Sequence, residues 1–336
     1  KREENELSQA FTAYNTRIVT PPHGSMLPTS PVHKNIFMVA FALGLLIPVV
    51  IIFMRENMNT RVRGRKDLEN LTIPFIGEIP LFTRKKKGIL GKKPQEVKAV
   101  VVKEGNRDII NEAFRVLRTN LEFMTGKDKT SNVIIMTSFN PGSGKSFLTM
   151  NIAMSLAIKG KKVLVIDGDL RHASASSYID SPDKGLSDYL GGRIDNLDEI
   201  IVPDPKHKSM DILPVGTIPP NPTELLFDER LKQTIDTVRE QYDYVLIDCP
   251  PVELVADTQI IEKLADRTIF VVRAGLLERS MLSELEKIYD EKKYKNMSLI
   301  LNGTEGSGGR YGYCYGYRYG YGSGYHYGSD GKRGWW

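Results

Sequence analysis

Cysteine is scarce in this sequence, with Cys249 and Cys314 the only two among 336 residues. Two cysteines cannot build a disulfide framework, and these two do not stand at a metal-ligand spacing. The scarcity excludes a small disulfide-stabilised secreted domain and fits a reducing compartment. A content of 41% hydrophobic and 26% charged residues excludes wholesale disorder and a collagen-like repeat. The chain starts at Lys1 rather than at Met, so we expect a piece of a longer or processed protein.

Charge is unevenly distributed behind a modest net value of +5. Residues 55–103 hold 13 basic and 5 acidic residues, and residues 306–336 hold 4 basic and 1 acidic residue. Residues 104–305 carry 25 basic and 32 acidic residues. The chain is therefore an acidic body between a basic arm and a basic tail, and 8 of its 15 tyrosines lie in that tail.

Residues 35–54 contain no charged side chain and are almost entirely apolar. Twenty helical residues cover about 30 Å, the thickness of the hydrocarbon core of a bilayer. A buried core helix would show a polar stripe, and a signal peptide would have a shorter apolar run, so we predict a transmembrane helix. Basic residues crowd its carboxyl side at positions 55–66 while only Lys34 precedes it closely, which predicts that residues 55–336 are cytoplasmic. Beside a bilayer, the basic arm is expected to contact anionic lipid headgroups.

Short apolar runs alternate with helical patterns from about Ile109 onward. The runs are typical of strands covered on both faces, and the alternation predicts a doubly wound, mainly parallel α/β sheet. Helices are expected over Ser146–Lys159 and Ser280–Lys292. Residues 55–105 are interpreted as a basic juxtamembrane linker with one small apolar element over residues 71–80, and residues 304–336 as a disordered tail. The predicted strands are Val133–Thr137, Lys162–Ile166, Asp211–Pro214, Tyr244–Ile247, Thr268–Val272 and Ser298–Leu301.

A phosphate-binding loop is predicted directly after the first of these strands. The loop ends in Gly144, Lys145 and Ser146 and leads into a helix, so its N–H groups and the helix N-terminus form an anion site. Lys145 is expected to reach the terminal phosphates, and Ser146 to ligate Mg²⁺. Phe139 stands where the motif usually has its first glycine, and the strand–loop–helix context supports the assignment. The candidate ATP-binding residues of this loop are Asn140, Pro141, Gly142, Ser143, Gly144, Lys145, Ser146 and Phe147.

Three aspartates follow two further strands. Asp167 and Asp169 are two positions apart, which places both on one side of an extended chain, and Asp248 ends the strand from Tyr244. Carboxylates at the carboxyl ends of strands lie at the ligand-binding edge of an open α/β sheet. Asp248 is a candidate Mg²⁺-ordering residue.

With these motifs the chain resembles the bacterial tyrosine kinases that accompany capsule and exopolysaccharide export. The resemblance is carried by the phosphate loop at 140–146, the apolar run and Asp-x-Asp at 163–169, the apolar run and Asp at 245–248, and the stretch Gly216–Leu226. Glu112, Arg115 and Arg118 match a Glu-x-x-Arg-x-x-Arg motif and share one helix face. Asn140 stands where partitioning-type ATPases have a lysine, which favours the kinase branch. Neither a Gly-rich kinase loop nor His-Arg-Asp nor Asp-Phe-Gly is present, which excludes a eukaryotic-type protein kinase.

The resemblance implies a P-loop fold and an ATP-dependent protein-tyrosine autokinase of the bacterial inner membrane that uses Mg²⁺. Lys145, Asp167 and Asp169 would be catalytic, with Asp167 as general base, and Ser146, Asp169 and Asp248 would hold Mg²⁺. Asn302 would contact adenine, and Arg171 would help to neutralise charge. Glu112, Arg115 and Arg118 would join subunits into a homo-oligomeric ring.

The same resemblance divides the chain into five parts. Residues 1–34 would end an extracytoplasmic co-polymerase domain, 35–54 would span the membrane, 55–105 would be the linker, 106–303 the kinase domain and 304–336 the autophosphorylation tail. Expected partners are the lipid bilayer, the polysaccharide polymerisation and export machinery and a tyrosine phosphatase.

The tail resembles a substrate once it is attached to an ATP site. Glycines leave its backbone free to enter the active site of a neighbouring subunit. Nucleic acid is not an expected partner, although stacking rings and arginines would also suit a single-stranded nucleic acid. Two alternatives stay open at this point, a membrane-tethered ATPase switch without kinase activity and a nucleic-acid-binding scaffold. The expected phosphoacceptors are Tyr311, Tyr313, Tyr315, Tyr317, Tyr319, Tyr321, Tyr325 and Tyr327.

Overall fold

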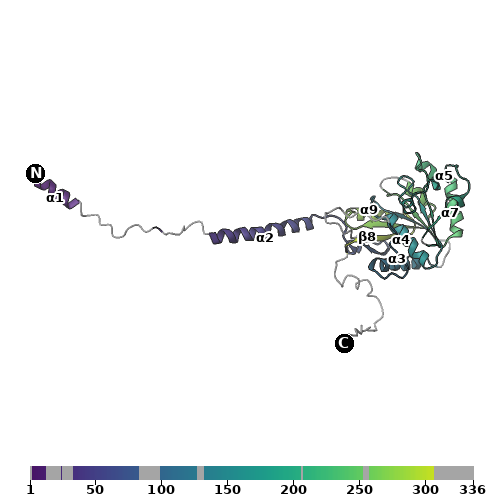
Figure 1. The fold of residues 1–336 in the computed structure, drawn as a ribbon, viewed down its shortest axis with the longest axis horizontal. Helices are drawn as coiled ribbons and strands as arrows, with labels where there is room; N and C mark the ends of the chain where they lie inside the picture. The colour runs from purple at the N-terminus through teal and green to yellow at the C-terminus, as the bar shows by residue number, and fades with distance from the viewer. Residues whose placement is uncertain are drawn as a thin grey trace, which may run out of the picture. The chain divides into compact units, whose positions relative to one another are not determined.

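The computed structural model describes residues 2–12, 24, 33–82, 99–126, 132–205, 207–252 and 257–305. The chain divides into two compact units, Lys1–Asn59 and Thr60–Trp336. Figure 1 shows the helices of the first unit and the α/β body of the second.

The first unit contains helix α1 (Arg2–Thr12) and helix α2 (His33–Asn57). Lys34–Arg55 within α2 forms a 22-residue stretch that is long and apolar enough to cross a membrane, by length and composition. A signal sequence near an N-terminus can be equally long and apolar. Pro48 lies inside the helix, where lipid-embedded segments tolerate it.

The second unit is built on one eight-stranded sheet with the order β1-β8-β7-β2-β6-β3-β5-β4. Every neighbouring pair is parallel except β4 with β5 at one edge. This confirms the predicted mainly parallel α/β fold, and each predicted strand is present with ends shifted by a few residues at most. The strands are β1 (Phe75–Pro80), β2 (Val133–Thr137), β3 (Val163–Asp167), β4 (Val202–Pro203), β5 (Met210–Leu213), β6 (Tyr244–Asp248), β7 (Arg267–Arg273) and β8 (Ser298–Thr304).

Helices cover both faces of this sheet (Figure 1). Alternate strand residues supply each face: Ile134 and Met136 pack toward α3 and α4, whereas Val133 and Ile135 pack toward α5, α7, α8 and α9. The two apolar layers explain why the strands read as continuous apolar runs. The α-helices are α3 (Ile109–Thr125), α4 (Lys145–Ile158), α5 (Leu186–Leu190), α6 (Pro222–Leu226), α7 (Glu229–Gln241), α8 (Asp257–Glu262) and α9 (Met281–Asp290), and the 3₁₀ helices are η1 (Arg65–Leu68), η2 (Ser176–Ile179) and η3 (Leu197–Glu199).

The segment interpreted as a juxtamembrane linker differs in the structure, because residues 60–82 belong to the second unit. β1 pairs in parallel with β8 at the edge of the sheet and buries Ile76 and Ile79. Ahead of it, Val62 is fully buried and donates its N–H to the carbonyl of Leu277 at 2.8 Å. The short apolar element of this segment is therefore a structural strand, and apolar burial holds it in place.

Candidate nucleotide site

The predicted phosphate loop lies between β2 and α4, at the carboxyl edge of the sheet. Ser138 and Ser143 both donate their hydroxyls to the carbonyl of Asn140, at 2.8 and 2.7 Å, which closes the loop on itself. Gly142 and Gly144 have φ angles of 74° and 87°, a region that side-chain-bearing residues rarely adopt. α4 begins at Lys145, so the loop delivers its N–H groups and Lys145 to one point.

Asn302 holds this loop from β8. Its amide Nδ2 donates to the carbonyl of Ser143 at 2.8 Å, and the side chain is buried. A Cβ at Gly144 would come within 2.2 Å of that amide nitrogen. Asn302 also lines the pocket described below, so its predicted contact with adenine stays a prediction beside this supporting role.

Asp167 and Asp248 face each other across the β3–β6 pair, where they are register partners. Both are buried. Asp248 Oδ2 accepts a hydrogen bond from the Ser146 hydroxyl, and Asp248 Oδ1 is buried without a partner among the described residues. Asp167 Oδ2 accepts two bonds of 2.7 Å, from the backbone N–H and the hydroxyl of Ser176.

Burial raises the pKa of both carboxyls. At Asp167 the bonds from Ser176 oppose that rise, whereas the nearby charge of Asp169 adds to it. At Asp248 the charge of Asp167 adds to the rise in pKa, and the charge of Lys145 opposes it. The pair is therefore short of positive charge and accepts protons or a cation readily.

Asp169 reaches the pocket from the loop after β3. Its Oδ1 accepts the backbone N–H groups of Arg171 and His172, and the His172 ring nitrogen Nδ1 lies 3.3 Å from it. Ala173 follows with a φ of 47°, an uncommon conformation for a residue with a side chain. Arg171 turns away from Asp169, because its Nε pairs with Asp257 at 3.1 Å and its Nη2 donates to the Thr223 hydroxyl at 2.9 Å.

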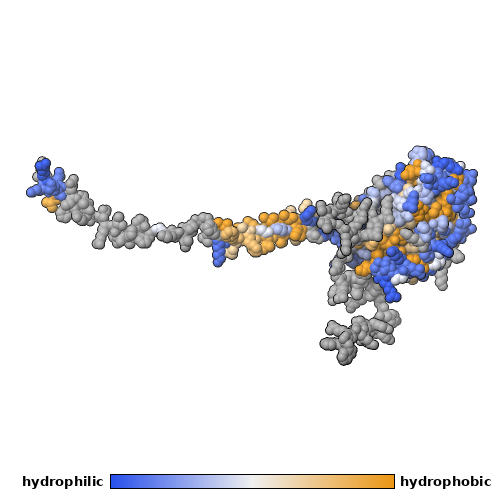
Figure 2. Space-filling model, in the orientation of Figure 1, coloured by the Kyte–Doolittle hydropathy of each residue, from blue (hydrophilic) through white to orange (hydrophobic). Residues whose placement is uncertain are grey.

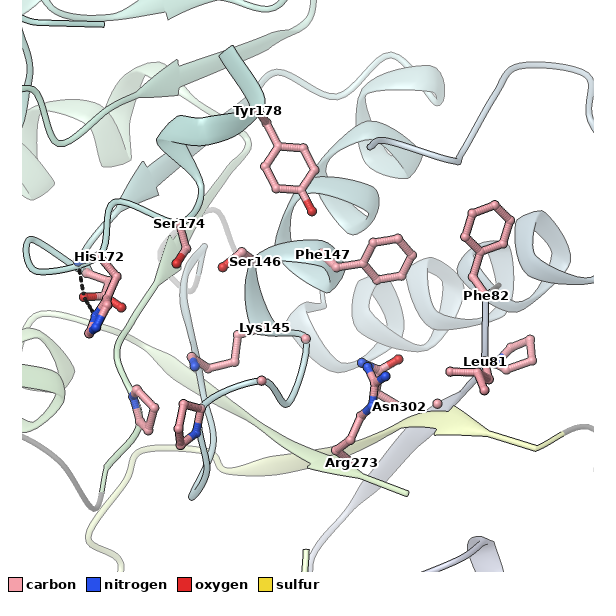
Figure 3. Close-up of a pocket in the computed structure, with 17 residues that line it drawn as sticks. Leu81, Phe82, Lys145, Ser146, Phe147, His172, Ser174, Tyr178, Arg273 and Asn302 are labelled. Atoms are coloured by element: carbon pink, nitrogen blue, oxygen red, sulfur yellow. Dashed lines mark hydrogen bonds and ion pairs between the residues drawn. The ribbon is translucent and has the colours of Figure 1, made fainter. Parts of the chain in front are cut away.

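A pocket of about 420 Å³ opens beside the loop. Figure 3 shows Lys145 and Ser146 between the rings of Phe147 and Phe82 on one side and His172 on the other. One end of the pocket is thus apolar and the other polar, as a nucleotide requires. The lining residues are Pro80, Leu81, Phe82, Pro141, Gly142, Gly144, Lys145, Ser146, Phe147, Asp169, His172, Ser174, Tyr178, Pro251, Arg273, Asn302 and Gly303.

Several of these lining residues were not expected from the sequence. Phe82 follows β1, Arg273 ends β7, and Tyr178 lies in η2. Arg273 could have been found as the polar residue that closes an apolar strand, like the three aspartates. Phe82 and Tyr178 carry no such signal, since only tertiary packing brings them to the loop. Asp167 is the reverse case, because this predicted catalytic residue is fully buried and is not among the lining residues.

The charged stripe on α3 is engaged within its own chain. Arg115 pairs with Glu112 and donates to the carbonyl of Asn106. Arg118 donates to the carbonyl of Ser155 on α4 at 2.7 Å. A subunit interface at these residues stays a prediction. The expected phosphoacceptors Tyr311–Tyr327 lie outside the described residues.

The oxygen atoms around Ser146 fit Mg²⁺. Asp248 offers a buried oxygen that has no partner among the described residues and lies beside the Ser146 hydroxyl, and hard oxygen ligands suit this ion. Within the described ranges no group of three or more His, Cys, Asp or Glu is arranged to hold a metal by itself.

Comparison with known proteins places this geometry in a family. Residues 131–300 match the family described as AAA domain. The chain is 30% identical over 315 residues to tyrosine-protein kinase etk of Escherichia coli K12, covering 90% of this chain and 43% of that protein. It is 31% identical over 315 residues to tyrosine-protein kinase wzc of Salmonella typhimurium LT2, covering 90% of this chain and 42% of that protein. The chain thus spans less than half the length of these curated relatives.

Solved structures of tyrosine kinase domains are also similar to this chain. The kinase domain of Escherichia coli tyrosine kinase ETK is 29% identical with a TM-score of 0.64, covering 77% of this chain and all of that one. The BceF tyrosine kinase domain is 31% identical with a TM-score of 0.61, covering 72% of this chain and 99% of that one. The chain belongs to the AAA domain family and, within it, to the bacterial tyrosine kinases.

Proposed function

We propose that this chain is an ATP-dependent protein-tyrosine autokinase that phosphorylates its own C-terminal tyrosines between subunits. The observation that carries the proposal is the meeting of Lys145, Ser146 and the three strand-end aspartates at one phosphate loop beside a nucleotide-sized pocket. Relatives named as tyrosine kinases support this activity over an ATPase switch.

Each residue of the site has a role in this proposal. Lys145 and the loop N–H groups would hold the β- and γ-phosphates. Ser146, Asp169 and Asp248 would hold Mg²⁺, which neutralises charge on the phosphates when bound. The rings of Phe147 and Phe82 would take the base, with Asn302 beside it.

Asp167 would act as the general base. The phenol oxygen of the acceptor attacks the γ-phosphorus, the bond to the leaving ADP oxygen breaks, and the phenol proton passes to Asp167. Oδ2 of this carboxylate accepts two hydrogen bonds of 2.7 Å from Ser176, whereas Oδ1 accepts one longer bond of 3.3 Å from the backbone N–H of Asp169, so Oδ1 would receive the proton. A carboxyl whose pKa is raised by burial is a better base near neutral pH than an exposed one.

The first unit and the named relatives support a proposed setting for this activity. We place α2 in the bacterial inner membrane with residues 55–336 in the cytoplasm, and the basic arm against lipid headgroups. A ring of subunits joined through Glu112, Arg115 and Arg118, control of exopolysaccharide or capsule polymerisation and export, and a resetting tyrosine phosphatase complete the proposal.

The test uses the full chain in detergent with Mg-ATP and phosphotyrosine mapping by mass spectrometry. Phosphate should appear on tyrosines of residues 311–327, and Lys145→Met should abolish it. Asp167→Asn should keep ATP binding and stop transfer. Bound ATP without any phosphotyrosine on wild-type protein would overturn the proposal.

Transfer between subunits is tested by mixing two variants. One is Lys145→Met with its tail intact, and the other is active but lacks residues 306–336. Label on the tail of the Lys145→Met protein supports transfer between subunits, and an unlabelled tail contradicts it.

A further inference from the structure

The surface around α6 exposes apolar side chains beside acidic ones. Ile218, which precedes the helix, is 58% exposed, and Phe227, which follows it, is 66% exposed. Glu224, Asp228 and Glu229 are the only charged residues between Gly216 and Glu229, and all three are exposed. We call Ile218, Glu224, Phe227, Asp228 and Glu229 the α6 patch. Figure 2 shows that several apolar areas lie among the hydrophilic surface of the second unit.

Four contacts link α6 to the active site. Asp169, which lines the pocket, accepts the backbone N–H of Arg171 at 3.3 Å. The Arg171 side chain then donates to Thr223 in the first turn of α6, and Thr223 donates to Asp257 at 2.7 Å. Asp257 also pairs with Arg171, so α6 is fixed beside the Asp169 loop.

The tail contains a tyrosine repeat, and the tyrosines that flank an acceptor could bind outside the catalytic position. Tyrosine occupies every second residue from 311 to 321, separated by Gly312, Cys314, Gly316, Arg318 and Gly320. In an extended chain such residues lie on one side, about 7 Å apart. When one tyrosine occupies the active site, its neighbours therefore lie about 7 and 14 Å away on the same side.

We propose that the α6 patch docks the tyrosines that flank the acceptor, with an extended stretch of residues 311–321 as the occupant. This inference rests on the proposed function. Ile218 and Phe227 would contact the flanking rings. The tail carries 4 basic and 1 acidic residue, so its charge complements the acidic residues of the patch.

The described chain ends at the sheet edge that carries the nucleotide site of its own subunit, so the tail of a neighbouring subunit starts at the corresponding point of that subunit. Thr304, the last residue of β8, accepts the N–H of Leu81, which lines the pocket. Residues 306–336 therefore continue from a point next to the nucleotide site.

The acidic residues of the α6 patch also give the docking a direction. Each phosphate adds about −1.5 to −2 charges to a tyrosine at pH 7. Glu224, Asp228 and Glu229 would repel a flanking phosphotyrosine. The patch thus accepts unmodified segments and releases modified ones.

The experiment sets two peptides of residues 311–321 in competition for the full chain. Both keep Tyr315 as the acceptor. One peptide carries Phe in place of all the remaining tyrosines, and the other carries Ser in place of all of them. Phosphorylation of both in one reaction gives the ratio of their kcat/KM values, which does not depend on the amount of active enzyme. The Phe peptide should be preferred about tenfold, the effect of partly burying aromatic rings.

The enzyme variant Ile218→Ser with Phe227→Ser should bring the ratio close to one. Phe123→Ser is the matched control, because Phe123 is 89% exposed on α3 and should leave the preference unchanged. A third peptide with phosphotyrosine at positions 313 and 317 should compete at least tenfold worse than the Phe peptide. Glu224→Gln with Asp228→Asn and Glu229→Gln should reduce that penalty.

A ratio near one with the wild-type enzyme overturns the inference, and so does a preference that survives in the Ile218→Ser, Phe227→Ser variant. Equal loss of preference with Phe123→Ser would point to a subunit contact as the occupant and would also overturn it. If neither peptide is labelled while ATP is bound, the proposed function fails. Binding of fluorescent Phe and Ser peptides then decides the docking inference by itself.

Discussion

Asp248→Asn is expected to stabilise the nucleotide-free protein while it removes activity. Asp248 is buried, and burial together with the charge of Asp167 raises its pKa to about 8. A carboxyl that must be protonated at pH 7 against an ordinary pKa of 3.8 costs at most about 4 kcal/mol of folding free energy. Asparagine removes that cost and keeps an oxygen for the Ser146 hydroxyl.

The net gain is smaller than this bound. The new amide group replaces an oxygen that has no partner among the described residues, so a buried donor is left unpaired at a cost of about 1–3 kcal/mol. A net stabilisation of about 2 kcal/mol remains, which corresponds to an increase in Tm of about 5 °C for a unit of this size. Thermal unfolding of the full chain in detergent and EDTA, without nucleotide, measures it.

The stability advantage of Asp248→Asn should depend on pH. A raised pKa means that the folded state binds the proton more tightly, so the cost is absent below pH 4 and grows as pH rises toward 8. The advantage of Asp248→Asn should therefore grow by up to about 1.4 kcal/mol per pH unit between pH 5 and 7. Asp236→Asn, at an exposed position on α7, is the control and should show no such growth. A lower Tm for Asp248→Asn at pH 7, or an advantage that shrinks with pH, would refute the reasoning.

Three further substitutions test the packing around the phosphate loop, at Asp167 and between β1 and α3. Gly144→Ala should lower ATP affinity at least tenfold by calorimetry, because its Cβ would displace the Asn302 amide; unchanged affinity would contradict that geometry. Ser176→Ala should lower kcat about tenfold at unchanged ATP affinity by freeing Asp167, with Ser176→Thr partly active, and a change in ATP affinity alone would argue otherwise. Gly77→Val should destabilise the second unit by about 1–3 kcal/mol in urea, because its Cβ would lie 2.8 Å from a side chain of α3; an unchanged midpoint would refute this contact.

The fold and the phosphate loop could be predicted because their signals are local. A buried parallel strand is an unbroken apolar run, and Lys145 with Ser146 at a helix start is readable from a few adjacent residues. The strand-end aspartates follow from the same runs, since a polar residue after a buried strand lies at the ligand-binding edge.

The missed features depend on contacts between distant segments. The residues of β1, which follow Pro74 and end at Pro80, indicate only a short apolar element in the sequence; they form a strand by pairing with β8 at the edge of the sheet, where proline is tolerated. Phe82 reaches the pocket only through that strand. The hydrogen bond from Ser176 to Asp167 joins residues nine positions apart, and no periodic pattern in the sequence indicates the turn between them.

The pairing of β1 with β8 also limits when the nucleotide site can fold during synthesis. Ile79 and Thr304 touch across 225 positions of sequence, so the edge strand made first pairs with the strand made last. At about 5–20 residues per second, a ribosome needs roughly 10–45 s to make the intervening chain. Throughout that time β8 is absent, so the part of the pocket wall formed by Leu81 and Phe82 has no strand to pair with. A nascent chain therefore cannot assemble a complete nucleotide pocket before β8 has been made.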